Sequence, residues 1–186
     1  MNRQTVGMLL LFVCSLLLWR WFDQSQDDQT SQARAIFQPN FTARQLTTMH
    51  YDSKGQLKER LESRYAEHYN QLEMTELEQP IITINDEQGH PIWRITGEKG
   101  VVNQGDNAIL REQVKIDNLQ PDSVVQRIRT EYLEMDLTNQ QVRTNLKVEM
   151  DGPEFHNQGV GFKGQLKQKT YQLLSNSHAV YFNPPR

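Results

Sequence analysis

LESR at residues 61–64 is the first of four short segments in this chain that share one pattern. In each segment a large apolar residue is followed by a polar, a small and a second polar residue. The other three are ITGE at 95–98, IRTE at 128–131 and FKGQ at 162–165, and the four starts are separated by 34, 33 and 34 residues. Self-similarity at a fixed period of this size is typical of stacked architectures, in which no repeat buries its apolar face alone. The repeat therefore predicts an elongated surface or trough, a layout that is unusual for a compact enzyme with one catalytic pocket.

The small residue stands at one fixed place in each repeat, and the four copies are Ser63, Gly97, Thr130 and Gly164. A small residue inside a strand permits a bend or a close approach of backbone or ligand. A simple packing constraint between stacked strands explains it equally well, and the sequence leaves these alternatives open.

Period-two alternation indicates strands throughout the chain after about residue 40. Val142, Leu146, Val148 and Met150 alternate with polar residues, apart from one break, and shorter runs around Lys115 and Thr83 do the same. Such patterns are typical of strands with one apolar and one solvated face. Turn-rich clusters separate them at 52–55, 85–89, 103–107 and 139–141. Residues 59–78 could be helical by composition, but their place in the repeat favours strands there too.

The first 22 residues differ from the rest of the chain and predict a membrane anchor. The stretch from Thr5 to Trp19 carries no charge, and a helix over residues 4–22 would be roughly 28 Å long, close to the hydrocarbon thickness of a bilayer. Arg20 is near the end, where its side chain can reach the headgroups. The residues that we expect to hold the anchor in the membrane are Val6, Leu10, Leu17, Trp19 and Trp21. We therefore expect a transmembrane anchor at 1–22, a polar linker at 23–39 and a β domain at 40–186.

Two other interpretations of the N-terminus are open. A cleaved signal peptide lacks the small-x-small cleavage site, because the residues around Trp19 are bulky. A lipoprotein anchored through Cys14 lacks the small residue expected before it, since Val13 stands there. The charges of Arg3 and the terminal amine favour a cytoplasmic N-terminus, although Arg20 argues weakly against it.

Composition and motifs narrow the classes of function. The formal net charge is −3 and Arg3 and Arg20 are the only charged residues before Asp23, so residues 23–186 carry about −5, which excludes a basic nucleic-acid footprint. The single cysteine, Cys14, lies in the anchor, and an exported domain without thiols fits a bacterial periplasm. Phosphate-binding, dinucleotide and nucleophile-elbow motifs are missing, the five histidines have no metal-ligand spacing, and no acid–base pair for a hydrolase can be named. The sequence thus predicts neither an enzyme nor a cofactor or metal site.

Several short motifs, taken in order, make the chain similar to a known family. They are YDSKG at 51–55, QPIIT at 79–83, PIW at 91–93, PDS at 121–123 ahead of QRIR at 126–129, Gly152 before Phe155, and GFKG at 161–164. With the short anchor and the polar linker, they make the chain resemble the LptC family of the lipopolysaccharide export system over nearly its whole length.

The resemblance implies a fold and a function. The fold would be a single N-terminal transmembrane helix followed by an open, twisted antiparallel β-jellyroll in the periplasm, shaped as a trough with an apolar interior. The trough would receive lipopolysaccharide from the inner-membrane ABC transporter, made of LptB, LptF and LptG, and pass it to the periplasmic bridge protein LptA. The helix would pack against the transporter and temper its ATPase. An alternative is a membrane-anchored assembly module of the envelope that binds proteins and never touches lipid.

The resemblance also implies roles for individual residues. Leu46 and Leu77 match lipid-contacting positions, and Gly152, Tyr171 and Tyr181 match positions near the edge that meets the bridge protein. Asn176 departs from the family pattern, in which a lysine is expected, so an electrostatic contact there is in doubt. We expect the C-terminal edge strand at 179–182 and the N-terminal edge strand within 41–51, each free to pair with a neighbouring protein.

Overall fold

A computed structural model describes residues 38–103 and 107–182. The chain divides into two compact units, Met1–Pro39 and Asn40–Arg186, and the account that follows concerns the second. The predicted anchor, with Val6, Leu10, Leu17, Trp19 and Trp21, and nearly all of the predicted linker lie outside the described residues. Within the described ranges, no helix has the length and apolar character needed to cross a bilayer.

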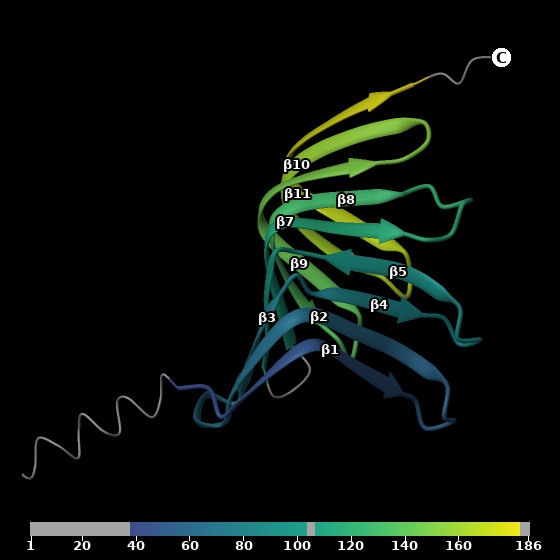
Figure 1. The fold of residues 1–186 in the computed structure, drawn as a ribbon. Coiled ribbons are helices and arrows are strands. Elements are labelled where there is room, and N and C mark those ends of the chain that lie inside the picture. The colour runs from purple at the N-terminus through teal and green to yellow at the C-terminus, as the bar shows by residue number, and fades with distance from the viewer. Residues whose placement is uncertain (1–37, 104–106, 183–186) are drawn as a thin grey trace, which may run out of the picture. The chain divides into compact units, whose positions relative to one another are not determined.

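The described part of the second unit is an antiparallel sheet of 11 strands with one short 3-10 helix (Figure 1). The elements are β1 (Phe41–Tyr51), β2 (Leu57–Tyr69), η1 (Asn70–Leu72), β3 (Met74–Glu78), β4 (Ile81–Asn85), β5 (Pro91–Thr96), β6 (Lys99–Asn103), β7 (Asn107–Asn118), β8 (Arg127–Asp136), β9 (Gln141–Asp151), β10 (Phe155–Gln165) and β11 (Thr170–Tyr181). The all-β antiparallel prediction is confirmed. Residues 59–78 form β2 and β3 with a single turn of η1 between them, so the repeat indicated the structure of this stretch better than its composition did.

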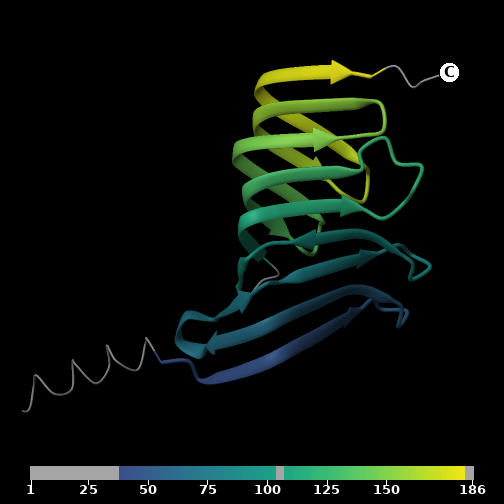
Figure 2. The same ribbon diagram turned by 45° about the horizontal axis from the view of Figure 1, so that its top comes forward.

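The long strands bend in the middle and so contribute to two layers (Figure 2). The first half of β2 pairs with β4 and its second half with β3, while β7 pairs with β6 and then with β5. Layer A consists of β4, β5 and residues 46–51, 57–62, 114–118, 127–130, 147–151, 155–160 and 175–181. Layer B consists of β3, β6 and residues 41–44, 65–69, 107–111, 132–136, 141–144, 162–165 and 170–173. This is a jellyroll-like arrangement in which one sheet folds over on itself.

The small residues of the sequence repeat mark the line of bends. Ser63 lies between the two halves of β2, Gly97 between β5 and β6, and Thr130 where the pairing of β8 shifts register. The fourth copy differs from the prediction, because the bend in β10 lies at Gly161, whose φ is +77°, and Gly164 is three residues beyond it. Glycine adopts a left-handed backbone angle at no steric cost, so the bend in β10 forms at Gly161, although other bends, such as that at Gln45, accept a larger residue at such an angle.

The hydroxyl groups at the bends take over hydrogen bonds that the sheet loses there. Ser63 Oγ lies 2.6 Å from the carbonyl oxygen of Tyr65 and 2.8 Å from that of Glu78, and Thr130 Oγ1 donates to the carbonyl of Lys147 at 2.9 Å. Both side chains are buried. Because a buried backbone carbonyl needs a partner, the small polar residues make the bend possible as well as leaving room for it.

The apolar faces of the two layers pack against each other. The most deeply buried large side chains come from both layers, and they include Ile84, Trp93, Ile95 and Ile116 of layer A and Leu133 and Phe162 of layer B, together with Leu166 of the β10–β11 turn. The alternation of apolar and solvated faces is therefore confirmed. In the centre of the domain, from β4 to β10, the interior is filled by these side chains.

Candidate functional site

The apolar inner face continues from the filled centre toward both end strands. Leu61 on the β1–β2 side and Phe155, Tyr171 and Leu173 on the β10–β11 side are partly buried against the central cluster. Among the described strands, β1 pairs only with β2 and β11 only with β10. The sheet thus does not close on itself. Its apolar face reaches β11 at one end and, at the other, extends to Leu61 of β2, beside the half-buried Leu46 of β1.

The two leucines expected to contact lipid lie near the N-terminal end of this face. Leu77 in β3 is 4% exposed and stands in register between Ala66 of β2 and Gly100 of β6. Leu46 in β1 is half-buried and stands opposite Ser63, directly after Gln45, whose φ of +55° marks the bend of β1. Leu46 thus lies in layer A and Leu77 in layer B, on opposite sides of the line of bends.

The C-terminal edge presents a group of exposed apolar side chains. Val180, Tyr181 and Phe182 are 42%, 77% and 52% exposed, and Tyr181 packs at 6.4 Å from the ring of Phe155 in β10. The N-terminal edge has a comparable group, Phe41, Met49 and Tyr51. Exposed apolar residues on a strand with one free side are typical of strands that pair with a partner.

Tyr171 belongs to the same edge strand as Tyr181 but faces the interior. Its ring stacks on Phe162 at 6.3 Å and meets Trp93 edge-on at 6.2 Å. Its buried hydroxyl has no hydrogen-bond partner among the described residues, and burial raises the pKa of Tyr171 to about 12. The structure therefore places Tyr171 behind the edge and Tyr181 on it.

Gly152 holds the β9–β10 turn close to the loop between β7 and β8. Its N–H donates to the carbonyl of Phe155 at 2.9 Å, and a Cβ added to it would stand 2.2 Å from the carbonyl oxygen of Val124 and 2.4 Å from the Phe155 ring. Since Phe155 packs on Tyr181, this turn supports the C-terminal edge from behind.

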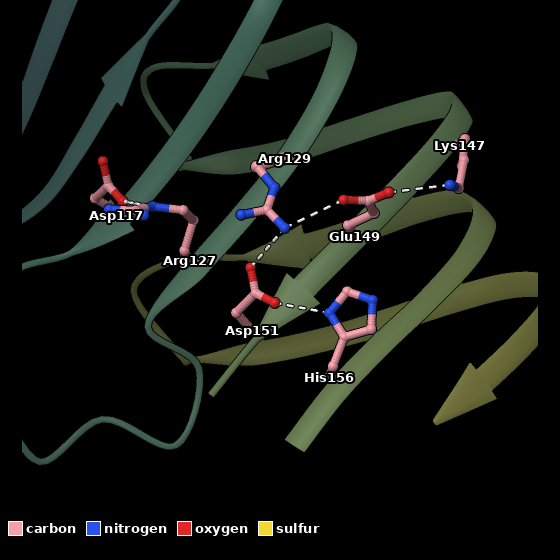
Figure 3. A network of polar contacts seen from close by, with 7 residues as sticks. All are labelled: Asp117, Arg127, Arg129, Lys147, Glu149, Asp151 and His156. Atoms are coloured by element: carbon pink, nitrogen blue, oxygen red, sulfur yellow. Dashed lines mark hydrogen bonds and ion pairs between the residues drawn. The ribbon is translucent and has the colours of Figure 1, made fainter. Parts of the chain in front are cut away.

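The outer face of layer A carries a ladder of charged residues (Figure 3). Arg129 lies 3.2 Å from Glu149 and 3.0 Å from Asp151, and Asp151 in turn contacts His156 at 2.7 Å. Hydrogen bonds from Lys147 and Arg129 hold the pKa of Glu149 below its ordinary value. A general acid needs a raised pKa, so Glu149 suits a cross-strand ion pair with Arg129 better than the role of a general acid. Within the described residues, no three His, Cys, Asp or Glu side chains gather as metal ligands do.

A hollow of about 890 Å³ lies at the layer B ends of β7 to β11. Its lining mixes polar residues, such as Gln141, Arg143 and Lys163, with apolar residues of the inner face, such as Met135 and Val142. A smaller hollow of about 270 Å³ borders Leu77, between Tyr65 and Arg111. Both hollows therefore present apolar as well as polar surface, and the first borders residues of the apolar interior, such as Met135 and Val142.

One repeated feature of the turns was not recognised in the sequence. Asp52 and Asp86, which are 34 residues apart, each accept two backbone N–H groups on one carboxylate oxygen, at 2.8–2.9 Å. Gly55 and Gly89 follow three residues later with φ of +78° and +83°. The D-x-x-G spacing recurs with the period of the four segments and could have identified two equivalent hairpin turns.

Comparison with known proteins agrees with this architecture. The lipopolysaccharide export system protein LptC of Escherichia coli strain K12 is 23% identical over 182 residues, covering 97% of this chain and 95% of its own. The protein of the same name from Haemophilus influenzae is 22% identical over 196 residues, covering 96% and 94%. Among solved structures, LptH of Pseudomonas aeruginosa, the LptA homologous periplasmic component of the conserved lipopolysaccharide transport device, has a TM-score of 0.54 at 8% identity, covering 68% of this chain and 95% of its own.

The decisive match is to a whole family. The sequence profile described as lipopolysaccharide-assembly, LptC-related, matches residues 7–182, which include every strand of the sheet. The membership that the short motifs predicted is therefore confirmed, and the chain belongs to the LptC-related family of lipopolysaccharide-assembly proteins.

Proposed function

We propose that this chain is a membrane-anchored bridge of lipopolysaccharide transport. It receives lipopolysaccharide from the inner-membrane ABC transporter, made of LptB, LptF and LptG, and passes it to LptA for delivery to the outer membrane. The anchor crosses the inner membrane once with its N-terminus in the cytoplasm, and the β domain lies in the periplasm. Family membership and the names of the relatives support a role in lipopolysaccharide transport, and the LptH-like fold fits a module of such a device.

The observation that carries the proposal is an apolar inner face that reaches the free strand β11 at one end and borders the free strand β1 at the other. Exposing an acyl chain to water costs ~0.8 kcal/mol per CH₂, so a chain of twelve such groups faces about 10 kcal/mol in an aqueous compartment. An apolar lining that continues from one protein into the next removes most of that cost. The sheet also satisfies its own backbone, which lets the lining stay dry.

The two free strands are the partner edges of the proposal. A transporter component adds a strand at β1, and LptA adds a strand at β11, beside the exposed side chain of Tyr181. Main-chain pairing would align the inner faces of successive proteins, because strand register fixes which side chains face the core. The chain works passively in this proposal, and the driving force comes from the ATPase.

Site-specific photo-crosslinking in cells tests the proposal. A crosslinker at Leu46 or Leu77 is expected to capture lipopolysaccharide only while the transporter hydrolyses ATP. The matched controls are Thr47 and Glu76, the exposed neighbours that point to the opposite face. Equal capture from the control positions would contradict an interior route.

The filled centre of the domain favours a second candidate, an assembly module that joins proteins without binding lipid. Trp93, Phe162 and Leu166 are 0% exposed and fill the interior between the two layers. This alternative predicts that Tyr181→Pro abolishes partner binding and function while crosslinkers at Leu46 and Leu77 never capture lipid. Lipid capture at either leucine rules it out.

A further inference from the structure

The turn between β10 and β11, residues 166–169, reaches from layer B across to layer A. Leu166 is 0% exposed and packs into the shared apolar cluster. Its carbonyl oxygen accepts a hydrogen bond from Trp93 Nε1 of layer A at 3.3 Å, and its N–H donates to the carbonyl of Gln140 at 3.0 Å. The side chain of Leu166 thus covers the apolar interior beside the turns that connect the strands.

Two lysines of the same turn contact loops of the opposite layer. Lys167 Nζ lies 3.5 Å from Glu87 in the β4–β5 turn, and Lys169 Nζ donates to Gln120 Oε1, before β8, at 2.6 Å. A third contact of this kind is the hydrogen bond that Lys58 Nζ of β2 donates to the carbonyl of Thr138 in the β8–β9 turn at 3.3 Å. These contacts bring the strand-end turns of the two layers together opposite the line of bends.

The closed arrangement leaves buried polar atoms unsatisfied beside the turn. Gln140 Oε1, Gln165 Oε1 and the hydroxyl of Tyr171 are buried without a hydrogen-bond partner among the described residues. Gln165 precedes Leu166 in the chain, the carbonyl of Gln140 accepts the N–H of Leu166, and the ring of Tyr171 meets that of Trp93, which donates to Leu166. Unsatisfied buried groups destabilise the state that contains them. The exposed lysine contacts favour closure only modestly, by about a few-fold each in the ratio of closed to open states, because Lys167 and Glu87 are 70% and 80% exposed. Burial of Leu166 favours the closed state and the three polar atoms oppose it, so the closed state is less stable than the burial of Leu166 alone would make it.

We infer that the 166–169 turn is a latch, which lifts away from Trp93 to admit an acyl chain sideways between the two layers. When the turn lifts, the three polar atoms become hydrated and the apolar cluster gains an entrance beside Trp93. The inference rests on the proposed function, and it reconciles a filled interior with a lipid route. It commits to an acyl chain because Leu166 belongs to the same apolar cluster as Trp93, Phe162 and Val142, so the space that its departure opens is apolar.

A covalent staple tests the latch in the full-length chain with Cys14→Ser in detergent. Glu87→Cys with Lys167→Cys, bridged by a short reducible bismaleimide, ties the turn to layer A. The matched control is Lys163→Cys with Gln172→Cys, which are opposite each other in β10 and β11 and tie the hairpin only to itself. Purified lipopolysaccharide is the probe, and the readouts are its binding and the hydrogen exchange of residues 166–169.

The unstapled protein and the control staple are expected to bind lipopolysaccharide and to show several-fold faster exchange in the turn when it is added. The Glu87–Lys167 staple is expected to weaken binding at least tenfold and to suppress the exchange, and reduction of the linker should restore both. Binding at the control level in the stapled form would overturn the latch and leave the proposed function standing. Failure of the unstapled protein to bind would instead overturn the proposed function, and the latch with it.

A second variant loosens the latch instead of fixing it. Lys167→Ala with Lys169→Ala removes two exposed contacts and leaves Leu166 in place, so the fold is expected to persist. The turn should exchange faster without lipid, and lipopolysaccharide loading should accelerate several-fold. An unchanged loading rate, with exchange in the turn also unchanged, would count against a latch at this turn.

Discussion

The carbonyl oxygen of Val124 stands 2.2 Å from the place that a side-chain carbon on Gly152 would occupy. No side chain fits there, since the oxygen belongs to the backbone and the ring of Phe155 closes the other side at 2.4 Å. The turn between β9 and β10 can therefore rest on the preceding loop only because residue 152 is glycine. Gly152 can therefore affect the edge strand β11 without belonging to it, because it positions Phe155, which packs on Tyr181.

Gly152→Ala is expected to destabilise the domain by about 3 kcal/mol, because overpacking against backbone forces the turn and the loop apart. The displacement should loosen Phe155 and with it Tyr181, and so weaken the LptA binding that we propose at β11. Urea denaturation measures the loss of stability, and co-purification of LptA measures the proposed binding. Gly97→Ala is the control, since its added carbon would meet Arg111 at 3.3 Å and should cost clearly less.

Tyr171→Phe is expected to change how stability depends on alkaline pH. Burial raises the pKa of Tyr171 to about 12 from an ordinary 10.0, so the folded state favours the neutral phenol. The stability that comes from the raised pKa of Tyr171 is therefore fully present below pH 10 and is lost as pH rises through about 12. The variant should lose less stability than the parent between those values in thermal melts.

At neutral pH the same variant should be as stable as the parent or up to ~1 kcal/mol more stable, because it removes a buried hydroxyl without a partner. Tyr69→Phe is the comparison, since a hydrogen bond to Glu67 raises the pKa of Tyr69 to about 12 as well. A clear loss of stability for Tyr171→Phe at pH 7 would mean that its hydroxyl is bonded.

Thr130→Val is expected to cost ~1–2 kcal/mol, although the two side chains have nearly the same volume. The variant removes the 2.9 Å hydrogen bond to the buried carbonyl of Lys147 at the bend of β8 and β9. Chemical denaturation provides the measurement. The exposed Thr48 of β1 supplies the control, and Thr48→Val should change stability little.

Arg129→Ala should cost at most ~1 kcal/mol, despite the two carboxylates that the guanidinium contacts. Its side chain is 39% exposed and its partners are 34% and 31% exposed, so water and salt screen the pairs. The difference from the parent should shrink when denaturation is repeated in high salt. A larger, salt-independent effect would indicate that Arg129 supports the layer by packing.

Asp52→Asn with Asp86→Asn should make the domain less sensitive to acid. Backbone N–H groups of Gln56 and His90, with desolvation acting against them, hold the pKa values of these aspartates below their ordinary 3.8. A lowered pKa gives stability that is present above pH 3.8 and lost as pH falls through the folded-state value. Melting temperatures below pH 4 should therefore fall less steeply in the double variant.

Local pattern was enough to predict most of the fold. Alternation around Val148 and Val114 identified strands, and the spacing of Ser63, Gly97 and Thr130 identified the position at which the strands bend or end. Both signals are periods that can be followed along the sequence without knowledge of the fold. The bend in β10 escaped prediction, since the pattern around Phe162 matched the repeat while the left-handed angle was at Gly161. Family resemblance then supplied the jellyroll.

Contacts between distant residues could not be predicted in the same way. Trp93 and Leu166 are 73 residues apart, and nothing in the sequence around either indicates that a turn folds over the interior. Tyr171 was expected near the partner edge, and its strand is the edge, but strand register turned its ring toward Phe162. Which face a residue takes depends on pairing across the whole sheet, which a single sequence does not display.

A sheet that ends in one unpaired strand on each side has two unlike faces for joining, and these cannot match in the manner of a twofold dimer. Units joined head to tail through such faces form rows that grow without closing. The row has a direction, and each added unit extends it by the same pitch. The distance between two membranes could then be matched by the number of units instead of by the size of any one, and a cap is needed at each end to stop growth.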